Sequence, residues 1–293
     1  MKLIDGKIIA DAIKTEIAIE VRKMIDDGKN PPHLAALLVG DDPASQTYVA
    51  NKEKSCKEVG FTSSVYRLPA RTSEKEVLET VDFLNNDPEV DGFIVQLPLP
   101  EHISVNKVIE RIDPSKDVDG FHPINLGRML AGVPSFLPAT PYGIMQLIER
   151  SKIDTVGKNC VILGRSNIVG TPMSVLMSRN NAHANSTVTL CHSKTANIKE
   201  ICAKADILIV AIGKQQYVTS DMVKEGAVVI DVGMHRVPST QTKSGFRLVG
   251  DVDFANVSPK CSYITPVPGG VGLMTIVALL DNTLKAAKKE FSF

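Results

Sequence analysis

The sequence lacks several features that would assign it to a specialised class of protein. Its 293 residues contain no tryptophan, and the five cysteines are scattered without a C-x-x-C pair. This usage argues against a disulfide framework or a structural zinc site and favours reduced thiols. No apolar run reaches the length of a membrane span, and the amino-terminal stretch carries Asp5 and Asp11 within its apolar pattern, unlike a signal peptide. We therefore expect a cytoplasmic protein with no membrane partner.

The sequence also has no excess of positive or negative charge. Thirty-three Lys and Arg residues balance 33 Asp and Glu residues, so no net field attracts the chain to nucleic acid. Apolar residues make up 43% and charged residues 23%, which is an ordinary globular composition. The length suffices for one large or two modest domains. We expect no nucleic-acid partner.

The hydrophobic pattern predicts an α/β protein. Apolar strands alternate with helical spacers, which indicates parallel sheets. In the first part, helices are expected from residue 8 to Gly28, 43–60 and 73–86, and strands at 33–40, 61–68 and 92–98. In the second part, strands are expected at 159–164, 186–191, 206–213 and 226–233, each pair joined by a helix, and a long helix follows at 271–289.

This second alternation predicts a doubly wound, Rossmann-like domain. Periodicity fails between Asp113 and Pro141, where proline and glycine are frequent, so a domain junction is expected there. The predicted boundaries give one domain from 1–139 and 272–293, and a second from 140–271.

The segment TYVANK places Tyr48 four residues before Lys52. Asp42 and Pro43 predict a helix start just upstream, so both side chains lie on one helical face. The spacing alone does not distinguish the acid–base pair of short-chain reductases, another kind of active site and two ordinary surface residues, of which the last is the most common. In those reductases the glycine-rich turn precedes the Tyr-Lys pair, whereas here Tyr48 precedes Gly164, so the reductase interpretation fails.

A nucleotide site is predicted at the segment VILGRSNIVGTP. Gly164 ends a strand and Gly170 begins a helix, an arrangement that offers backbone N–H groups to a phosphate, although Arg165 and Ser166 interrupt the usual G-x-G-x-x-G pattern. A plain strand-to-helix turn is the alternative. The next strand ends in LCHSKT, without the carboxylate that normally binds the ribose hydroxyl of NAD. With Arg165, residues 192–194 favour the 2′-phosphate of NADP.

Taken in order, TYVANK, VQLPLP, KDVDGF, GRSNIVGTP, CHSKT and TPVPGGVG closely resemble one family over essentially the whole chain. This is the bifunctional methylenetetrahydrofolate dehydrogenase / methenyltetrahydrofolate cyclohydrolase family. The resemblance implies a folate-binding catalytic domain, an NADP-binding domain, a folate substrate lying between them and a homodimer. It also implies that the carboxyl-terminal helix returns to the first domain.

The resemblance assigns residues to each role. The implied catalytic residues are Lys52, Tyr48, Gln96 and Asp119. The implied substrate-binding residues are Ser45, Tyr48, Asp119, Pro268, Gly269 and Gly270, and the implied NADP-binding residues are Gly164, Arg165, Ser166, Ser193 and Met234. Lys52 is expected to deprotonate water with Gln96 orienting it, and Asp119 to bind the pterin edge.

Several alternatives stay open. Asp113, Asp117 and Asp119 also fit a turn cluster or a divalent-metal site, although we expect no metal. The family usually has Pro-Met-Thr after PGGVG, whereas this chain has Leu273, which makes the rigidity of that loop and the affinity for folate less certain. A dehydrogenase without the hydrolytic activity, or a non-catalytic NADP-binding protein, would share much of this pattern.

Overall fold

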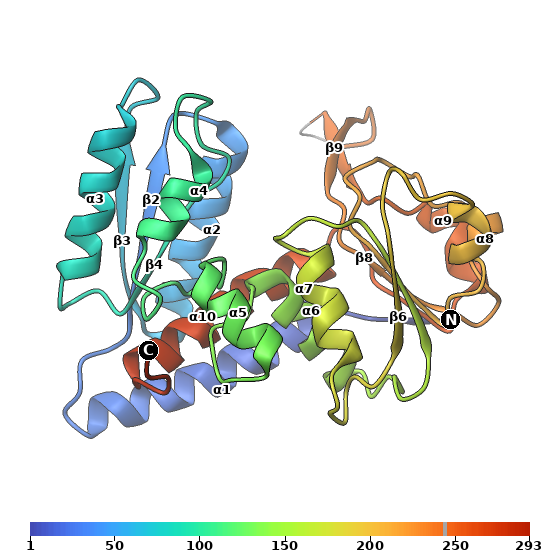
Figure 1. Cartoon of the computed structure of the whole chain (residues 1–293), viewed down its shortest axis with the longest axis horizontal. Helices are drawn as coiled ribbons and strands as arrows, with labels where there is room; N and C mark the ends of the chain where they lie inside the picture. Colours follow the sequence, from blue (N-terminus) through green and yellow to red (C-terminus); the bar gives the residue numbers. More distant parts are fainter. Residues whose placement is uncertain (243–244) are drawn as a thin grey trace. The chain divides into compact units, whose positions relative to one another are not determined.

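The chain divides into two compact units, each built on its own parallel sheet (Figure 1). The computed structural model describes residues 1–242 and 245–293. The six-stranded unit comprises Met1–Asp11 and Thr140–Thr275, and the three-stranded unit comprises Ala12–Ala139 and Ile276–Phe293. The division therefore places residues 1–11 and 272–275 with the six-stranded unit, whereas the sequence analysis assigned them to the first domain.

The three-stranded unit has the strand order β3-β2-β4, all parallel. Its strands are β2 (His33–Val39), β3 (Thr62–Leu68) and β4 (Gly92–Val95). Its helices are α2 (Pro43–Val59), α3 (Glu74–Asn86), α4 (Val105–Arg111) and α5 (Pro123–Ala131), with most of α1 (Gly6–Asp26) and of α10 (Val271–Ala287).

The core of this unit follows from the alternation of side chains along β2. Ala35, Leu37 and Val39 face a cluster that includes Phe93 of β4 and Val81 of α3, all almost fully buried. The intervening residues of β2 are also buried, as expected for a central strand covered on both faces. Figure 1 shows α3 and α2 on opposite sides of this sheet.

The six-stranded unit has the strand order β1-β11-β8-β7-β5-β6. Its strands are β1 (Lys2–Leu3), β5 (Asn159–Leu163), β6 (Thr187–Cys191), β7 (Ile207–Val210), β8 (Val228–Asp231) and β11 (Tyr263–Ile264). A separate antiparallel pair is formed by β9 (His235–Pro238) and β10 (Phe246–Val249). The helices are α6 (Ala139–Arg150, which begins one residue before the unit), α7 (Gly170–Ser178), α8 (Ile198–Cys202) and α9 (Phe254–Val257), with the single turns η1 (Ser220–Met222) and η2 (Ser258–Lys260).

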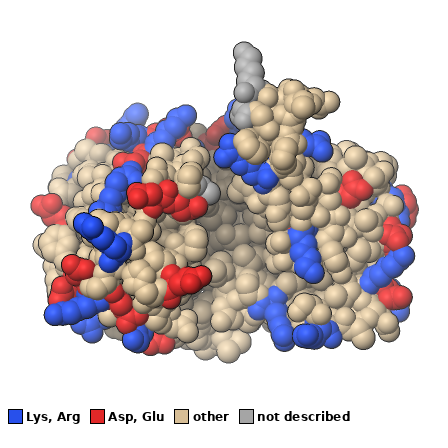
Figure 2. Space-filling view, turned by 90° about the horizontal axis from the view of Figure 1, so that it is seen from above, with Lys and Arg blue, Asp and Glu red and all other residues tan. Residues whose placement is uncertain are grey.

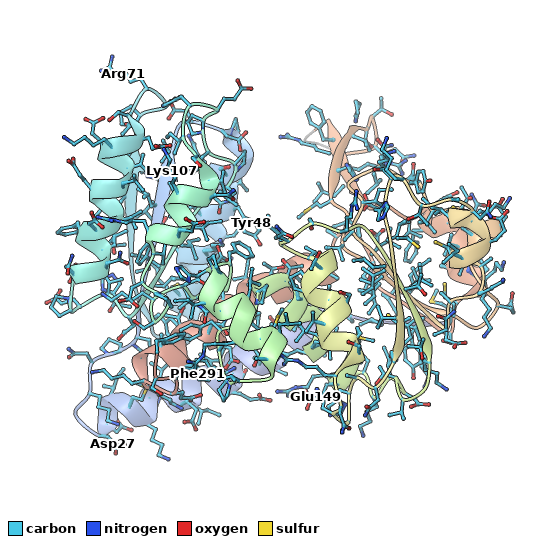
Figure 3. The ribbon with its side chains drawn as sticks, in the orientation of Figure 1. Asp27, Tyr48, Arg71, Lys107, Glu149 and Phe291 are labelled. Carbon is cyan, nitrogen blue, oxygen red and sulfur yellow. The ribbon has the colours of Figure 1, made fainter. Side chains whose placement is uncertain are left out.

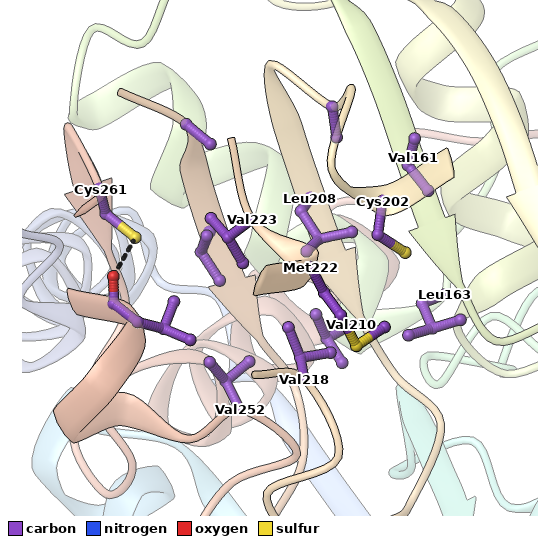
Figure 4. Close-up of a cluster of buried hydrophobic side chains, with 14 of the residues drawn as sticks. Val161, Leu163, Cys202, Leu208, Val210, Val218, Met222, Val223, Val252 and Cys261 are labelled. Carbon is purple, nitrogen blue, oxygen red and sulfur yellow. Dashed lines mark hydrogen bonds between the residues drawn. The ribbon is translucent and has the colours of Figure 1, made fainter. Parts of the chain in front are cut away.

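One face of this sheet packs on a continuous apolar cluster (Figure 4). Alternate residues of β5 and β7, such as Val161 and Leu208, contact residues of the following connections, such as Met222. Cys202 and Cys261 lie in the same cluster, and all five cysteines of the chain are free and buried. The opposite face is covered in part by α7, which contacts β5 and β6.

The predicted doubly wound arrangement is confirmed, with one correction. The sequence analysis expected a full helix between the strands at 206–213 and 226–233, but the connection contains only the single turn η1. The connection instead forms a turn at residues 215–216, where Gln216 has φ of 49°, and it is held by hydrogen bonds from Gln216 N–H to Gly250 O and from Val218 N–H to Asp251 O. The junction from Asp113 to Pro141 also contains a regular helix, α5, which begins at Pro123 after the cap residue His122.

The surface agrees with the balanced composition. Basic and acidic side chains both occur on each unit in the face drawn in Figure 2. Within the described ranges, no helix combines the length and apolar character that a bilayer crossing requires.

Candidate active site

Helix α2 positions three of the predicted site residues. Asp42 caps it, its Oδ2 accepting the Ser45 N–H at 2.7 Å, and Pro43 occupies the first turn, as predicted from the sequence. The helix ends at Gly60, which adopts a left-handed conformation with φ of 83°. Ser45 is buried in the first turn, and Tyr48 and Lys52 follow on successive turns of the same helix.

Tyr48 and Lys52 form a pair. The Nζ of Lys52 lies 4.6 Å from the centroid of the Tyr48 ring, which is within the range of a cation–π contact. Lys52 is only 6% exposed, whereas Tyr48 is partly exposed and projects from α2 in Figure 3. The spacing in the sequence therefore brings a buried amine beneath an accessible aromatic ring.

Gln96 joins this pair from the sheet. It directly follows β4, and its N–H donates to Leu37 O at 2.9 Å, which continues the ladder to β2. Its Nε2 donates to Leu97 O at 2.7 Å, so its Oε1 is left to face Lys52, whose Nζ donates to it at 3.4 Å. The backbone thus determines which end of the Gln96 amide meets the amine.

Asp119 lies in a turn that a second aspartate organises. Asp117 is buried and accepts hydrogen bonds from the N–H groups of Phe121 and His122 and from the Asn125 side chain. Asp119 is partly exposed, and its own carbonyl accepts the Ala139 N–H. The Asp117 carboxylate therefore stabilises the turn, whereas Asp119 remains partly accessible.

Burial determines the electrostatics of Lys52 and Asp119. It lowers the pKa of Lys52 below its ordinary value, although the charge of Asp119 opposes this shift. Burial likewise raises the pKa of Asp119 to about 6, with Lys52 acting in the opposite direction. A lysine whose pKa is lowered is unprotonated more often than an exposed lysine, and it is therefore better suited to accept a proton.

The Asp113 and Asp117 side chains favour the turn interpretation of the acidic cluster. Asp113 accepts the N–H and hydroxyl of Ser115, and Asp117 is satisfied by the contacts described above. Within the described part of the chain, no three histidine, cysteine or acidic side chains are grouped closely enough to hold a metal ion.

The six-stranded unit provides a second group of predicted residues at its topological switch point. Strand β5 lies between β6 and β7. The connection after β5 leads to β6 on one side of it, and the connection after β6 leads back across to β7 on its other side. Ligands of doubly wound sheets bind outside the carboxyl ends of the strands at such a point. Gly164 follows β5 there, with φ of 124°, and a side chain on it would collide with Ala211 O after β7.

The segments that contain Arg165 and Ser193 leave adjacent strands at this edge. The Gly164 N–H donates to Cys191 O at 2.9 Å, which joins the turn after β5 to the end of β6. Arg165 and Ser166 are exposed after β5, and Ser193 and Lys194 are exposed after β6. The turn from 192 to 195 is closed by a hydrogen bond from the His192 N–H to Thr195 Oγ1 at 2.9 Å.

These residues match the requirements of a dinucleotide with a phosphorylated ribose. Gly170 begins α7 so close to Gly164 that a side chain on it would collide with the Gly164 carbonyl. The strand, turn and helix are therefore packed as tightly as a phosphate-binding turn requires. Residues 192–195 supply hydroxyl, imidazole and ammonium groups and no carboxylate.

The remaining predicted residues also lie in the six-stranded unit. Met234 follows β8 and is 52% exposed. Pro268, after a cis peptide bond, begins the loop that contains Gly269 and Gly270 and leads into α10. Gly270 has no room for a side chain because Pro266 O lies 2.6 Å from the position of its Cβ. The structure thus gathers Ser45, Tyr48, Lys52, Gln96 and Asp119 in one unit, and the glycine-rich loop and the predicted cofactor residues in the other.

Sequence reasoning missed two features of this site. Gly6 lies against the Gly270 carbonyl so closely that any side chain would collide with it. The buried Asp231 and Asp251 and the partly exposed His235 form a hydrogen-bonded group at the carboxyl edge of the six-stranded sheet. The acidic residues within the apolar segments AVVIDVG and LVGDVDF were the available signal for that group.

The fold and the two groups of residues define an α/β enzyme in which one unit is built to bind a nicotinamide dinucleotide. Comparison with protein-family models identifies it further. Residues 4–119 match the catalytic domain of tetrahydrofolate dehydrogenase/cyclohydrolase, and residues 138–291 match its NAD(P)-binding domain. The chain belongs to the tetrahydrofolate dehydrogenase/cyclohydrolase family.

Individual relatives agree with this assignment. The chain is 59% identical to the bifunctional protein FolD of Cytophaga hutchinsonii, covering 98% of this chain and 99% of that protein. It is 58% identical to FolD of Porphyromonas gingivalis over 98% of this chain and 97% of that one. The crystal structure of FolD from Campylobacter jejuni matches with a TM-score of 0.93 and 48% identity, covering 99% of this chain and all of that one.

A further solved structure bears on the cofactor. The methylenetetrahydrofolate dehydrogenase-cyclohydrolase of Trypanosoma brucei, complexed with NADP and an inhibitor, matches with a TM-score of 0.91 and 36% identity. The match covers 98% of this chain and 97% of that one.

Proposed function

We propose that this chain catalyses two successive steps of folate chemistry. It oxidises 5,10-methylenetetrahydrofolate to 5,10-methenyltetrahydrofolate with NADP and hydrolyses the product to 10-formyltetrahydrofolate. The family membership over both units supports the assignment. The observation that carries the hydrolytic step is the buried Lys52 amine between Tyr48 and Gln96.

The first step removes a hydride from the methylene carbon and leaves a cation shared by two nitrogens. NADP, when bound, accepts the hydride. No proton leaves the folate in this step, so the chain needs to align two rings and does not need a base. We assign Gly164, Arg165, Ser166, Ser193 and Met234 to holding the dinucleotide.

The second step adds water to the cationic carbon, after which a carbon–nitrogen bond breaks and a formyl group remains on one nitrogen. One proton of the water must be removed, and Lys52 is the proposed acceptor because burial lowers its pKa. Gln96 orients Lys52 or the water through Oε1, and Tyr48 packs over the ligand.

Substrate binding is assigned to residues of both groups. The ionised Asp119 accepts hydrogen bonds from the amino-pyrimidine edge of the pterin, as a charge-assisted pair. Ser45 and the loop of Pro268, Gly269 and Gly270 complete the proposed folate contacts. We also propose a cytoplasmic homodimer that has no nucleic-acid or membrane partner.

A two-substrate assay tests this function. Methylenetetrahydrofolate with NADP should give NADPH, and methenyltetrahydrofolate alone should lose its absorbance as it is hydrolysed. NADPH formation without hydrolysis of added methenyl-folate would identify a monofunctional dehydrogenase instead. NADP binding without turnover of either folate would identify a non-catalytic protein.

A further inference from the structure

Two buried carboxylates at the carboxyl edge of the six-stranded sheet have no role in the steps described above. Asp231 is the last residue of β8 and is 3% exposed, and Asp251 is fully buried. A buried carboxylate is costly unless hydrogen bonds satisfy its oxygens. The partners of these two groups therefore indicate what they hold in place.

Asp251 holds the loop after β7. Its Oδ2 accepts the N–H groups of Ile212 and Gly213, both at 2.8 Å. Its Oδ1 contacts the Nε2 of His235 at 2.7 Å. One carboxylate thus joins the loop at the topological switch point to the residue that follows Met234.

Asp231 holds Asp251 in turn. Its Oδ1 accepts the N–H groups of Gly233 and Asp251, both at 2.9 Å, and its Oδ2 accepts the Val252 N–H at 3.0 Å. Burial raises the pKa of Asp231 to about 6, so it is ionised at neutral pH and can accept all three bonds. The backbone around it is tight, because a side chain at Gly250 would collide with its carboxylate.

These contacts converge on the predicted cofactor residues. Met234 lies between Gly233, which Asp231 binds, and His235, which Asp251 binds. On the other side, Gly164 packs directly on Ala211, the residue before Ile212. Asp251 therefore links the loops after β7 and β8, and the loop after β5 packs against the first of these.

We propose that Asp251, together with His235 and Asp231, is a positioning residue for the dinucleotide. It acts through the loops at 211–213 and 233–235 and does not itself contact the ligand. The proposal rests on the proposed function, because it takes NADP as the ligand of this edge. It predicts that the contacts of Asp251 determine the affinity for NADP and leave the hydrolysis of methenyl-folate untouched.

The test measures NADP binding to the purified full-length chain by isothermal titration calorimetry, alongside the melting temperature and hydrolysis of methenyl-folate without NADP. Asp251→Asn retains the size of the side chain but removes its charge and one acceptor. We expect the Kd for NADP to rise by roughly ten- to a hundredfold, since charge-assisted bonds to two N–H groups and a ring are weakened. Hydrolysis should stay at the wild-type rate.

A second pair of variants covers the case in which Asp251→Asn does not fold. His235→Leu should also weaken NADP binding, whereas His235→Gln should restore much of it because its amide N–H can donate to Asp251. Asp206→Asn is the matched control. Asp206 accepts the Asn159 N–H at the opposite edge of the same sheet, so its loss should lower the melting temperature without changing the Kd for NADP.

Three outcomes would overturn the proposal. The first is that folded Asp251→Asn and His235→Leu bind NADP as tightly as the wild type. The second is that the control Asp206→Asn weakens NADP binding to the same degree as Asp251→Asn. The third is that hydrolysis and NADP binding in these variants fall in parallel with the melting temperature, which would indicate a purely structural role. A wild type that does not bind NADP would instead contradict the proposed function.

Discussion

The Lys52 amine lies 3.4 Å from the Gln96 side-chain oxygen, and the Gln96 amide nitrogen is already committed to Leu97 O. The amine of α2 is thus held by an oxygen whose orientation is determined at the end of β4. This arrangement gives the amine a neutral hydrogen-bond partner, and burial lowers its pKa despite the opposing charge of Asp119. It is consistent with an amine that must be able to accept a proton.

Replacing Lys52 tests this assignment. Lys52→Met retains most of the buried volume and removes the amine, so hydrolysis of methenyl-folate should be abolished. Oxidation of methylene-folate should persist in part, because hydride transfer needs no base. Lys54→Met is the control, since Lys54 lies on the same helix with its side chain 77% exposed. Hydrolysis at the wild-type rate in folded Lys52→Met would exclude Lys52 as the catalytic group.

Asp119 is expected to act mainly on the folate. Asp119→Ala should weaken folate binding about ten- to a hundredfold, the equivalent of roughly 1.5–3 kcal/mol for a charge-assisted contact. NADP binding should change far less. Asp113→Ala, which removes a carboxylate of the neighbouring turn, serves as the comparison. Equal losses for both ligands in Asp119→Ala would point to a structural role.

The raised pKa of Asp119 gives folate binding a pH dependence. The ionised form accepts the pterin N–H groups, and it predominates only above about pH 6. As the pH falls through this value the carboxyl gains a proton, so the Kd for folate should rise by about tenfold per pH unit. Titrations between pH 4.5 and 8 would show the effect, and Asp119→Asn should give a flat profile. A wild-type Kd that is constant through pH 6 would contradict the assigned contact.

Cofactor choice is predicted from the turn residues of the six-stranded unit. Arg165→Ala should reduce the preference for NADP over NAD about ten- to a hundredfold, since a charged hydrogen bond contributes roughly 1.5–3 kcal/mol. NAD turnover should change much less, because NAD has no 2′-phosphate. Lys194→Ala should have a smaller effect that weakens as salt is added. The measurement is kcat/KM with each cofactor, and an equal loss for NADP and NAD in Arg165→Ala would show that Arg165 does not bind the 2′-phosphate.

Leu273 offers a test of loop rigidity. It lies in the first turn of α10, where proline is compatible with a helix, and it is 37% exposed. Leu273→Pro should raise stability by about 0.4–1 kcal/mol by restricting the unfolded chain. It should also tighten folate binding, with Leu273→Ala as the control for the lost side chain. A lower melting temperature in Leu273→Pro would show that position 273 does not tolerate proline.

Local rules explain why much of the fold was predictable. Asp42 and Pro43 marked the start of α2 to the residue, and the apolar runs located β2, β5 and β7. The connection that contains the single turn η1 depends on contacts distant in sequence, such as that of Val218 with Asp251. Periodicity carries no information about such contacts, and so a full helix was expected where the chain forms a turn and an isolated bridge from Val218 to Val252.

The same distinction applies to the candidate site. Spacing placed Tyr48 and Lys52 on one face, and the parallel pairing of β5 with β6 placed the turns after these two strands at the same edge of the sheet. The orientation of the Gln96 amide and the contacts of Asp251 could not be predicted from the sequence, because each depends on a hydrogen bond formed only in the folded chain.

The position of β1 has a consequence for how the six-stranded unit is made. Lys2 pairs with Tyr263, so the edge strand is synthesised long before the neighbour to which it binds. During translation this segment must remain unpaired until β11 emerges, and closing so long a loop is a slow step. The sheet is therefore completed late, and Gly6, which meets the Gly270 carbonyl, joins the glycine-rich loop in the same event. The glycine-rich loop is thus completed together with the last strand pairing of its own sheet.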